Sequence, residues 1–190
     1  MPYTCSVDTP LGPMTAAAEN DALIGLWFIG QKHYPAVTAG WSCQPDHPIF
    51  KALKLSLSSF FNGRNDGTEV PLAPQGTPFQ MAVWAALLRI PYGETVTYGE
   101  IAKEIAHAAG LRSMSAQAVG GGVGHNPISI LIPCHRVLGF NKSLTGYAGG
   151  LDKKEALLRL ERGTISVEGN PSVLEYAARG TGPGCFFCPR

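Results

Sequence analysis

The chain has little charge and no long apolar run, and each absence excludes a class of protein. Charged residues make up 15% of the 190 positions and hydrophobic residues 45%, a composition typical of a globular protein with buried cores. No apolar stretch approaches the ~20 residues that span a bilayer, so no membrane partner is expected. The N-terminus has no basic region followed by an apolar one, which argues against a secretory signal and favours a cytoplasmic location.

Cysteine is also sparse, and its distribution argues against a disulfide framework. The five cysteines are an odd number without regular spacing, which suits a reducing compartment. Cys185 and Cys188 resemble half of a zinc site or a redox pair, but no second ligand pair accompanies them. We therefore expect an exposed tail with no catalytic role there, and no metal site in the chain.

The net charge of +1 conceals a modest asymmetry between the two halves. Residues 1–77 hold four Lys or Arg and six Asp or Glu, a net −2, so the remainder of the chain carries +3. This excess favours an anionic partner for the C-terminal half, although a few surface charges more often indicate only a solvated face.

The order of predicted elements is that of an α+β protein in two parts. Three short strands, over residues 3–8, 14–18 and 23–29, precede an irregular stretch and a helix over 48–61. Residues 64–76 are polar and rich in glycine and proline, which is typical of a linker. The predicted parts are an N-terminal α/β domain over 1–74, a mostly helical domain over 75–165, and a tail over 166–190.

Three helices open the second part, and the last two predict a helix-turn-helix. Thr77 with Gln80, and Thr97 with Glu100, form capping boxes that begin the first two helices. The third helix, over 115–124, contains three consecutive glycines, each unfavourable by ~1 kcal/mol relative to alanine. The glycines have three interpretations. The helix packs closely against a neighbour, the segment is an irregular loop instead, or the small face of the helix enters a narrow nucleic-acid groove.

The rest of the second part is predicted to hold a hairpin and one more helix. Residues 137–147 would form a short hairpin, a wing beside the helix-turn-helix. The last helix is predicted over 149–163, with an inward face of Leu151, Ala156, Leu157 and Leu160.

An aliphatic run ends at a cysteine that a histidine follows at once. Residues 126–132 predict a buried strand that leads to Cys134 and His135. A thiol is mostly protonated near neutral pH, so Cys134 needs a base, and His135 can accept the proton directly or through a water. Glu161 on the last helix is the candidate to orient His135. A buried Asn126 must satisfy its hydrogen bonds, and it could tie the turn after the glycine-rich helix to the predicted strand that carries the cysteine.

Each of these residues also has a purely structural interpretation. Most cysteines like Cys134 are small buried hydrophobes, and most buried histidines like His135 are core residues with satisfied hydrogen bonds. Glu161 could be a surface residue in a last turn that also holds Arg159 and Arg162. Their occurrence together, downstream of a predicted helix-turn-helix, favours a catalytic role over a purely structural one.

The motifs around Cys134 resemble those of the O6-alkylguanine-DNA alkyltransferases, the methylated-DNA–protein-cysteine methyltransferases. The resemblance is strong over residues 77–163 and weaker over the N-terminal domain, where Thr9–Gly12 is the main match. The matching segments, in the family's order and spacing, are Gly76–Gln80, Val83–Trp84, Pro91–Gly93, Thr97–Gly99, Ala118–Gly120, Asn126–Pro127, Pro133–Val137 and Tyr147–Gly150.

This resemblance implies a DNA repair protein that acts once and uses no cofactor. Its expected fold is an N-terminal β-sheet domain of RNase H-like character followed by a winged helix-turn-helix domain. As a monomer, it would bind double-stranded DNA through the minor groove and flip the damaged guanine out of the stack. It would then transfer the alkyl group irreversibly to its own cysteine, with O6-methylguanine as the chief substrate and O4-methylthymine as a second.

The resemblance also assigns roles by position. Cys134 would accept the alkyl group, with His135 as a water-mediated base that Glu161 orients. Asn126 would be a buried hinge, and Tyr98 would press on the target phosphate and donate a proton towards the guanine. The further residues assigned to substrate or DNA contact are Ser115, Gln117, Gly99, Gly122, Arg136, Val137, Tyr147, Ala148 and Gly149.

Three positions depart from the family's pattern. Many members carry an arginine where Gln117 stands, and that arginine fills the gap left by the flipped base. Because glutamine is shorter and uncharged, we expect weaker or more sequence-tolerant flipping rather than loss of function. Ala148 replaces a serine often found in the pocket loop, which removes one polar contact to the base. Cys5 does not align with the zinc ligands of some animal members, so no zinc is expected.

Two other functions fit part of the pattern. A DNA-binding module without transfer chemistry would share the helix-turn-helix, but the non-transferring relatives lack the cysteine that Cys134 supplies. A cysteine hydrolase could use Cys134 and His135, but the base of such enzymes is usually distant in sequence. In addition, neighbouring side chains on an extended strand point to opposite faces.

Overall fold

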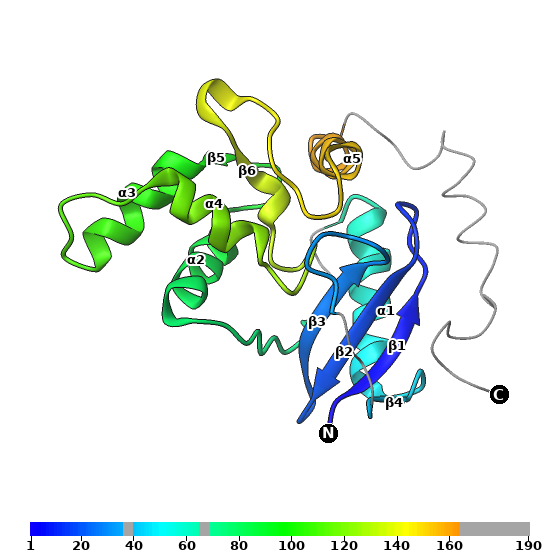
Figure 1. Ribbon diagram of the computed structural model, residues 1–190. Coiled ribbons are helices and arrows are strands. Elements are labelled where there is room, and N and C mark those ends of the chain that lie inside the picture. Colours follow the sequence, from blue (N-terminus) through cyan, green and yellow to red (C-terminus); the bar gives the residue numbers. More distant parts are fainter. Residues whose placement is uncertain (36–39, 65–68, 164–190) are drawn as a thin grey trace.

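The structure, a computed structural model, describes residues 1–35, 40–64 and 69–163 (Figure 1). A small sheet with one long helix precedes a set of helices, which confirms the predicted α+β class. The elements are β1 (Tyr3–Val7), β2 (Met14–Glu19), β3 (Ala22–Phe28), β4 (Ser42–Cys43), α1 (Pro48–Phe61), α2 (Pro78–Leu88), β5 (Val96–Thr97), α3 (Tyr98–Ala108), α4 (Ala116–Gly124), the 3-10 helix η1 (Cys134–Arg136), β6 (Val137–Leu138), the 3-10 helix η2 (Phe140–Lys142) and α5 (Leu151–Glu161).

The N-terminal sheet has the strand order β3-β2-β1-β4. β1 runs antiparallel to β2 and parallel to β4, and the Gly12 N–H closes the first turn by donating to the Thr9 carbonyl at 2.9 Å. Phe50, Leu53 and Leu57 of α1 belong to the same apolar cluster as the sheet. The three predicted strands and the first helix are confirmed. β4 lies in the stretch predicted to be irregular, because two paired residues are too few to show a periodic pattern.

Helices α2 and α3 begin at the two predicted capping boxes. The Thr77 hydroxyl accepts a hydrogen bond from the Gln80 N–H at 3.2 Å, and the Gln80 side chain accepts from the Thr77 N–H at 2.9 Å. Thr97 and Glu100 repeat this reciprocal pattern at α3. With α4 packed on both α2 and α3, this part of the chain forms the predicted helix-turn-helix.

The prediction of a buried strand over residues 126–132 is wrong, although the run is buried. The segment makes one isolated bridge, from Ile128 to β3, and then turns, with Ile130 at a φ of 71°. The Asn126 side chain supplies what a strand partner would have supplied. Its Oδ1 accepts from the Ile128 N–H at 3.0 Å, and its Nδ2 donates to the Ile132 carbonyl at 2.8 Å. Apolar periodicity cannot distinguish such a buried turn from a strand.

The predicted hairpin over residues 137–147 is also wrong. β6 pairs in parallel with β5, which lies about forty residues earlier in the chain. The segment then reverses in η2, where Asn141 and Lys142 both have positive φ, and the Gly139 N–H donates to the Ser143 carbonyl at 2.8 Å. Figure 1 shows this loop, in yellow, projecting beyond the two-stranded β5–β6 sheet. No second strand continues after so tight a turn.

One apolar cluster joins the two predicted domains. It contains Leu26 and Phe28 of β3 together with Ile128 and Ile132, so the turn over residues 126–132 rests on the N-terminal sheet. The predicted boundaries at residues 74 and 165 stay predictions. The tail 166–190, with Cys185 and Cys188, lies outside the described residues. Within the described part of the chain, no helix is both long and apolar enough to cross a membrane.

The consecutive glycines of α4 have different surroundings. The Gly122 carbonyl accepts a hydrogen bond from Trp84 Nε1 at 3.0 Å, and a Cβ on Gly122 would lie 2.9 Å from Val83 Cγ2. A Cβ on Gly121 would meet nothing within 4 Å. Close packing against α2 therefore explains Gly122, whereas Gly121 leaves one side of the helix open.

This contrast predicts opposite effects for two adjacent Gly→Ala substitutions. Gly122→Ala should destabilise the protein by about 1–3 kcal/mol, because β-branched Val83 must move to admit the methyl group. Gly121→Ala should leave stability unchanged or raise it by up to about 1 kcal/mol, since alanine is the better helix former. Urea unfolding followed by circular dichroism measures both, and equal effects of the two substitutions would refute this account of Gly122.

Candidate active site

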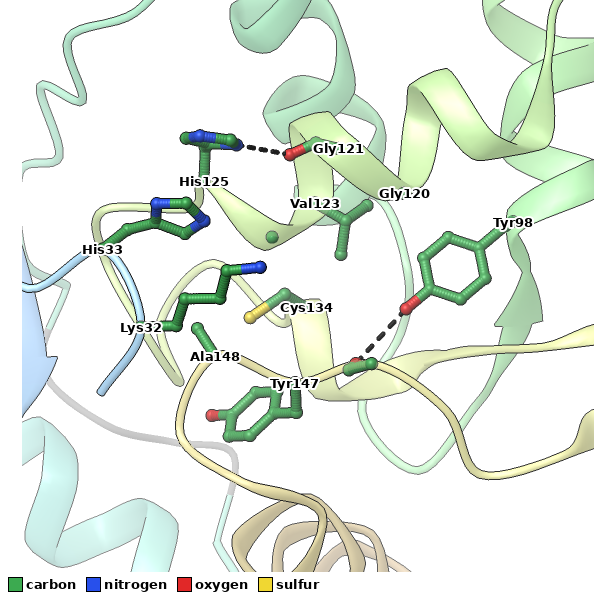
Figure 2. Close-up of a pocket in the computed structure, with 12 residues that line it drawn as sticks. Lys32, His33, Tyr98, Gly120, Gly121, Val123, His125, Cys134, Tyr147 and Ala148 are labelled. Carbon is green, nitrogen blue, oxygen red and sulfur yellow. Dashed lines mark hydrogen bonds between the residues drawn. The ribbon is translucent and has the colours of Figure 1, made fainter. Parts of the chain in front are cut away.

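Cys134 lies at the wall of a pocket of about 410 Å³ between the two parts of the chain (Figure 2). It begins η1, and only 5% of its surface is exposed. Tyr98 and Tyr147 lie on either side of it, and Sγ points towards the side of the pocket where Lys32 and Ala148 lie. The other lining residues are His33, Gly120, Gly121, Val123, Gly124, His125 and Gly146.

Asn126 fixes the position of the thiol. Besides its bonds to the turn, Asn126 Nδ2 lies 3.1 Å from Cys134 Sγ and donates a hydrogen bond to it. Asn126 follows directly on the C-terminus of α4, so one buried amide connects the end of that helix to the sulfur. This is the place expected for the hinge, with a bent segment instead of a strand.

Burial raises the pKa of the Cys134 thiol above its ordinary value. The hydrogen bond from Asn126, the positive charge of Lys154 and two backbone N–H groups act in the opposite direction without overcoming it. The sulfur is therefore a thiol near neutral pH. It is surrounded by groups that favour the thiolate once a base removes the proton.

His135 and Glu161 form the pair that was predicted from the sequence. His135 is fully buried, and its Nε2 lies 2.8 Å from Glu161 Oε1. Burial lowers the pKa of His135, although the carboxylate acts to raise it, so the ring is neutral and its Nε2–H donates to Glu161. The lone pair is then on Nδ1, which is buried and has no hydrogen-bond partner among the described residues.

The Glu161 carboxylate is satisfied from three directions. Arg136 donates to it through Nε at 2.9 Å and Nη2 at 2.8 Å, and the Gly93 N–H donates at 3.0 Å. Burial alone would raise the pKa of this carboxyl, but the hydrogen bonds and charges of His135 and Arg136 lower it to about 2. Glu161 is therefore ionised over the whole physiological range.

The prediction that Arg136 contacts DNA does not fit this geometry. Its side chain is buried, and its guanidinium is occupied by Glu161 and by the Ile90 carbonyl, to which Nη1 donates at 2.6 Å. Arg136 was assigned to substrate or DNA contact through the family resemblance of its motif. The burial of its partner carboxylate could not be seen in the sequence.

Two further predicted contact residues, Gly122 and Val137, also face inward. Gly122 packs against α2, as described above, and Val137 is fully buried, with its carbonyl bound by Lys154. Gly149 does not line the pocket either. A Cβ there would lie 2.9 Å from the Tyr147 ring, so the glycine makes room for that ring.

The remaining predicted contact residues line one of two hollows or cap α4. Tyr147 and Ala148 line the Cys134 pocket, as expected. Gln117 and Gly99 instead line a second groove of about 560 Å³, which shares Tyr98 with the first pocket. Ser115 caps α4, with its hydroxyl accepting from the Gln117 N–H at 3.2 Å. The contact residues predicted as one group thus belong to two adjoining hollows.

Lys154 is a site residue that the sequence reasoning missed. Its side chain is fully buried, and Nζ donates to the carbonyls of Val137 and Thr145 at 2.5 Å and of Gly146 at 3.0 Å. Burial lowers its pKa to about 8, with the nearby Cys134 acting against the shift. A signal was present, because Lys154 shares one helical face with Leu157, Leu158 and Glu161. Leu151, predicted to face inward, is 45% exposed.

The pocket mouth also uses residues from the N-terminal part, which no motif indicated. Lys32 and His33 come from the turn after β3, and the His33 ring stacks on His125 at the end of α4, with centroids 3.9 Å apart (Figure 2). Burial and the neighbouring positive groups lower the pKa of His33. In the described part of the chain, no group of three or more His, Cys, Asp or Glu side chains is placed to hold a metal ion.

Comparison with known proteins identifies the family. The model of the DNA-binding domain of 6-O-methylguanine DNA methyltransferase matches residues 78–163. A methylated-DNA–protein-cysteine methyltransferase of Mycobacterium tuberculosis is 45% identical over 157 residues, which cover 83% of this chain and 90% of that protein. This chain belongs to the methylated-DNA–protein-cysteine methyltransferase family. A second member, from Haemophilus influenzae, is 41% identical over 161 residues, which cover 84% of this chain and 86% of that protein.

The solved structures of this methyltransferase family agree with the fold. The crystal structure of Mycobacterium tuberculosis OGT in complex with DNA matches with a TM-score of 0.76 at 38% identity, and covers 90% of this chain and 99% of that chain. The resemblance proposed from the Pro133–Val137 motif is therefore confirmed at the level of the family.

The buried Glu161 pair predicts a large stability loss on substitution and a characteristic pH dependence. Glu161→Gln leaves the Arg136 guanidinium buried without its counter-charge, which should destabilise the protein by about 3–5 kcal/mol at pH 7. The pKa of Glu161 is lowered, so its stabilisation is fully present above pH 4.5 and is lost as pH falls towards 2. Urea unfolding should therefore show that the difference in unfolding free energy between wild type and Glu161→Gln shrinks as the pH falls from 4.5 towards 2.

Glu155→Gln is the matched control, because Glu155 pairs with Arg159 on the same helix at 2.5 Å but is half exposed. That exposed pair should contribute no more than about 1 kcal/mol. Two results would contradict a stabilising role for the buried Glu161 pair. One is an equal loss of unfolding free energy for the two substitutions. The other is a difference between wild type and Glu161→Gln that does not change between pH 5 and pH 2.

Proposed function

We propose that this chain is a DNA repair protein that flips an O6-alkylguanine out of duplex DNA and transfers the alkyl group irreversibly to Cys134. O6-methylguanine is the chief substrate and O4-methylthymine a second. The observation that carries the proposal is the buried Cys134 thiol, which Asn126 holds at the wall of an open pocket, directly before a histidine that is paired with Glu161. Membership of the family and the DNA complex of the Mycobacterium tuberculosis relative support it.

The first step is removal of the thiol proton. Because His135 Nε2–H is held by Glu161, the buried Nδ1 is the ring atom that can accept a proton, and a water relays it from Cys134. Asn126 and Lys154 then favour the thiolate, through a hydrogen bond and a positive charge respectively. Glu161 stays ionised and stabilises the imidazolium that forms.

The second step is displacement at the alkyl carbon. A lone pair of Cys134 Sγ forms the new S–C bond, the C–O6 bond breaks, and its electron pair stays on the guanine oxygen. The leaving guanine then needs one proton. Tyr98 lines the same pocket, and burial together with the nearby Cys134 raises the pKa of its phenol, so it is protonated and able to donate. A thioether offers no easy reverse reaction, so each chain acts once.

DNA recognition falls to the helix-turn-helix of α3 and α4. Gly121 and Gly124 leave one side of α4 without side-chain bulk, which suits close approach of the helix to a minor groove. The target base has to leave the stack to reach Cys134, because the thiol lies inside the pocket wall. We further propose that the protein acts as a monomer in the cytoplasm.

The alkyl transfer is tested by mass spectrometry after mixing the protein with a duplex that bears one O6-methylguanine. We expect one methyl increment per protein on the Cys134 peptide and none on the peptide of the buried Cys5. Cys134→Ser should bind the duplex and remain unmodified. Binding without any increment would instead indicate a non-repair module, and turnover of an ester or amide beyond one equivalent would indicate a hydrolase.

Gln117 is proposed to occupy the place of the flipped base, with less effect than the arginine many relatives carry. Gln117→Arg should therefore tighten binding to duplex DNA and speed alkyl transfer, because arginine is longer and charged. Any added positive charge favours DNA binding, so Gln44→Arg, at an exposed position beyond β4, is the control. A Gln117→Arg protein that behaves like the Gln44→Arg protein in both affinity and transfer rate would exclude this role.

A further inference from the structure

Phe140 is the most exposed large hydrophobic side chain of the described residues apart from the N-terminal methionine. Its exposed fraction is 87%, and it is the one aromatic among the exposed large hydrophobics of that part of the chain. Exposing a phenylalanine forgoes the free energy of burial, so its presence on a loop tip calls for a reason. An exposed aromatic at a functional surface is typical of a binding contact.

Hydrogen bonds of the loop hold the backbone at Phe140 in place. The Ser143 N–H and Ser143 hydroxyl both donate to the Phe140 carbonyl, at 3.2 and 2.8 Å, and the Lys142 N–H donates to the Gly139 carbonyl at 3.1 Å. A Cβ on Gly139 would lie 2.4 Å from Ser143 Oγ, so the turn is closely packed. The ring is thus presented on a compact turn instead of a loose loop, which reduces the entropy lost on binding.

Phe140 lines the second groove, together with Ala116 of helix α4. Gln117 lines the same groove. This groove and the Cys134 pocket share Tyr98, Gly120 and Gly146, so the two hollows adjoin on one surface. A duplex that delivers one nucleotide to Cys134 therefore places the neighbouring base steps over Phe140 and Gln117.

We propose that Phe140 is a DNA-contacting residue that stacks on a base of the duplex next to the flipped nucleotide. Apolar side chains that enter from the minor groove unstack base steps in this way, and any base offers a face for stacking. The ring complements Gln117, which can donate a hydrogen bond to the orphaned base but adds neither charge nor apolar area. This inference rests on the proposed function and adds a residue to it.

Affinity for duplex DNA tests the proposal. Phe140→Ala should weaken binding to a duplex with one O6-methylguanine by about 5- to 100-fold, the range seen for loss of one base–aromatic stack. Phe140→Trp should retain the affinity, because it keeps an aromatic face. Leu55→Ala removes an apolar side chain that is 62% exposed on α1 and lines neither hollow, and this variant should bind like wild type.

The salt dependence separates stacking from electrostatics. Phe140→Ala should leave the slope of log affinity against log salt unchanged, since no phosphate contact is lost. Lys142→Ala, on the same turn, should lower that slope by about one if Lys142 binds a phosphate. A changed slope for Phe140→Ala would mean that the turn had moved, and this would count against stacking.

Alkyl transfer from the free base O6-benzylguanine distinguishes the two proposals. That reaction needs the Cys134 pocket but no DNA, so Phe140→Ala should transfer at the wild-type rate. If wild type alkylates Cys134 and Phe140→Ala matches wild type in duplex affinity and duplex transfer rate, the stacking role is wrong and the repair function stands. If wild type reacts with neither the duplex nor the free base, the repair function itself is wrong.

Discussion

The site depends on one buried carboxylate, that of Glu161. Hydrogen bonds from His135, Arg136 and the Gly93 backbone converge on it, and these groups come from two separate segments of the chain besides α5. Arg136 also donates to the Ile90 carbonyl, so the segment just after α2 belongs to the same network. A buried charge is tolerable only when its partners are complete, and here the requirement orients His135, the residue that follows Cys134. The need to satisfy one carboxylate thus sets the tautomer of His135.

A second constraint acts from the opposite side of the sulfur, where the Asn126 amide replaces a strand partner. Its hydrogen bonds bend the aliphatic run into a turn and end on Cys134 Sγ, while its backbone continues directly from α4. The thiol is therefore positioned by the helix in front of it and by α5 behind it. Lys154 fixes the loop that carries Tyr147, because its Nζ donates to the Thr145 and Gly146 carbonyls. Each of these polar groups is buried, and each hydrogen-bonds to another segment of the site.

Features that depend on neighbouring residues were predictable from the sequence, and features that depend on contacts between distant residues were not. The two capping boxes and the Thr9–Gly12 turn follow from residues within four positions of each other, and the structure has them where they were expected. The Cys134–His135–Glu161 set was predicted from a motif and a family resemblance. The turn at Ile130, the buried Lys154 and the inward Arg136 were not, because each is stabilised by groups distant in sequence. Lys32 and His33 reach the pocket through packing of the N-terminal sheet, and no periodic pattern encodes that.

The burial of Cys134 has a consequence for how long the protein keeps its capacity to act. Oxidants and adventitious electrophiles react with exposed thiolates, and the steps beyond sulfenic acid are not reversed by ordinary reductants. Cys134 is 5% exposed, and its pKa is raised, so the resting sulfur is both shielded and protonated. A protein proposed to react once has no later cycle in which to recover a damaged sulfur. The apolar wall that makes the thiol a poor nucleophile at rest therefore also preserves it between synthesis and encounter with a lesion.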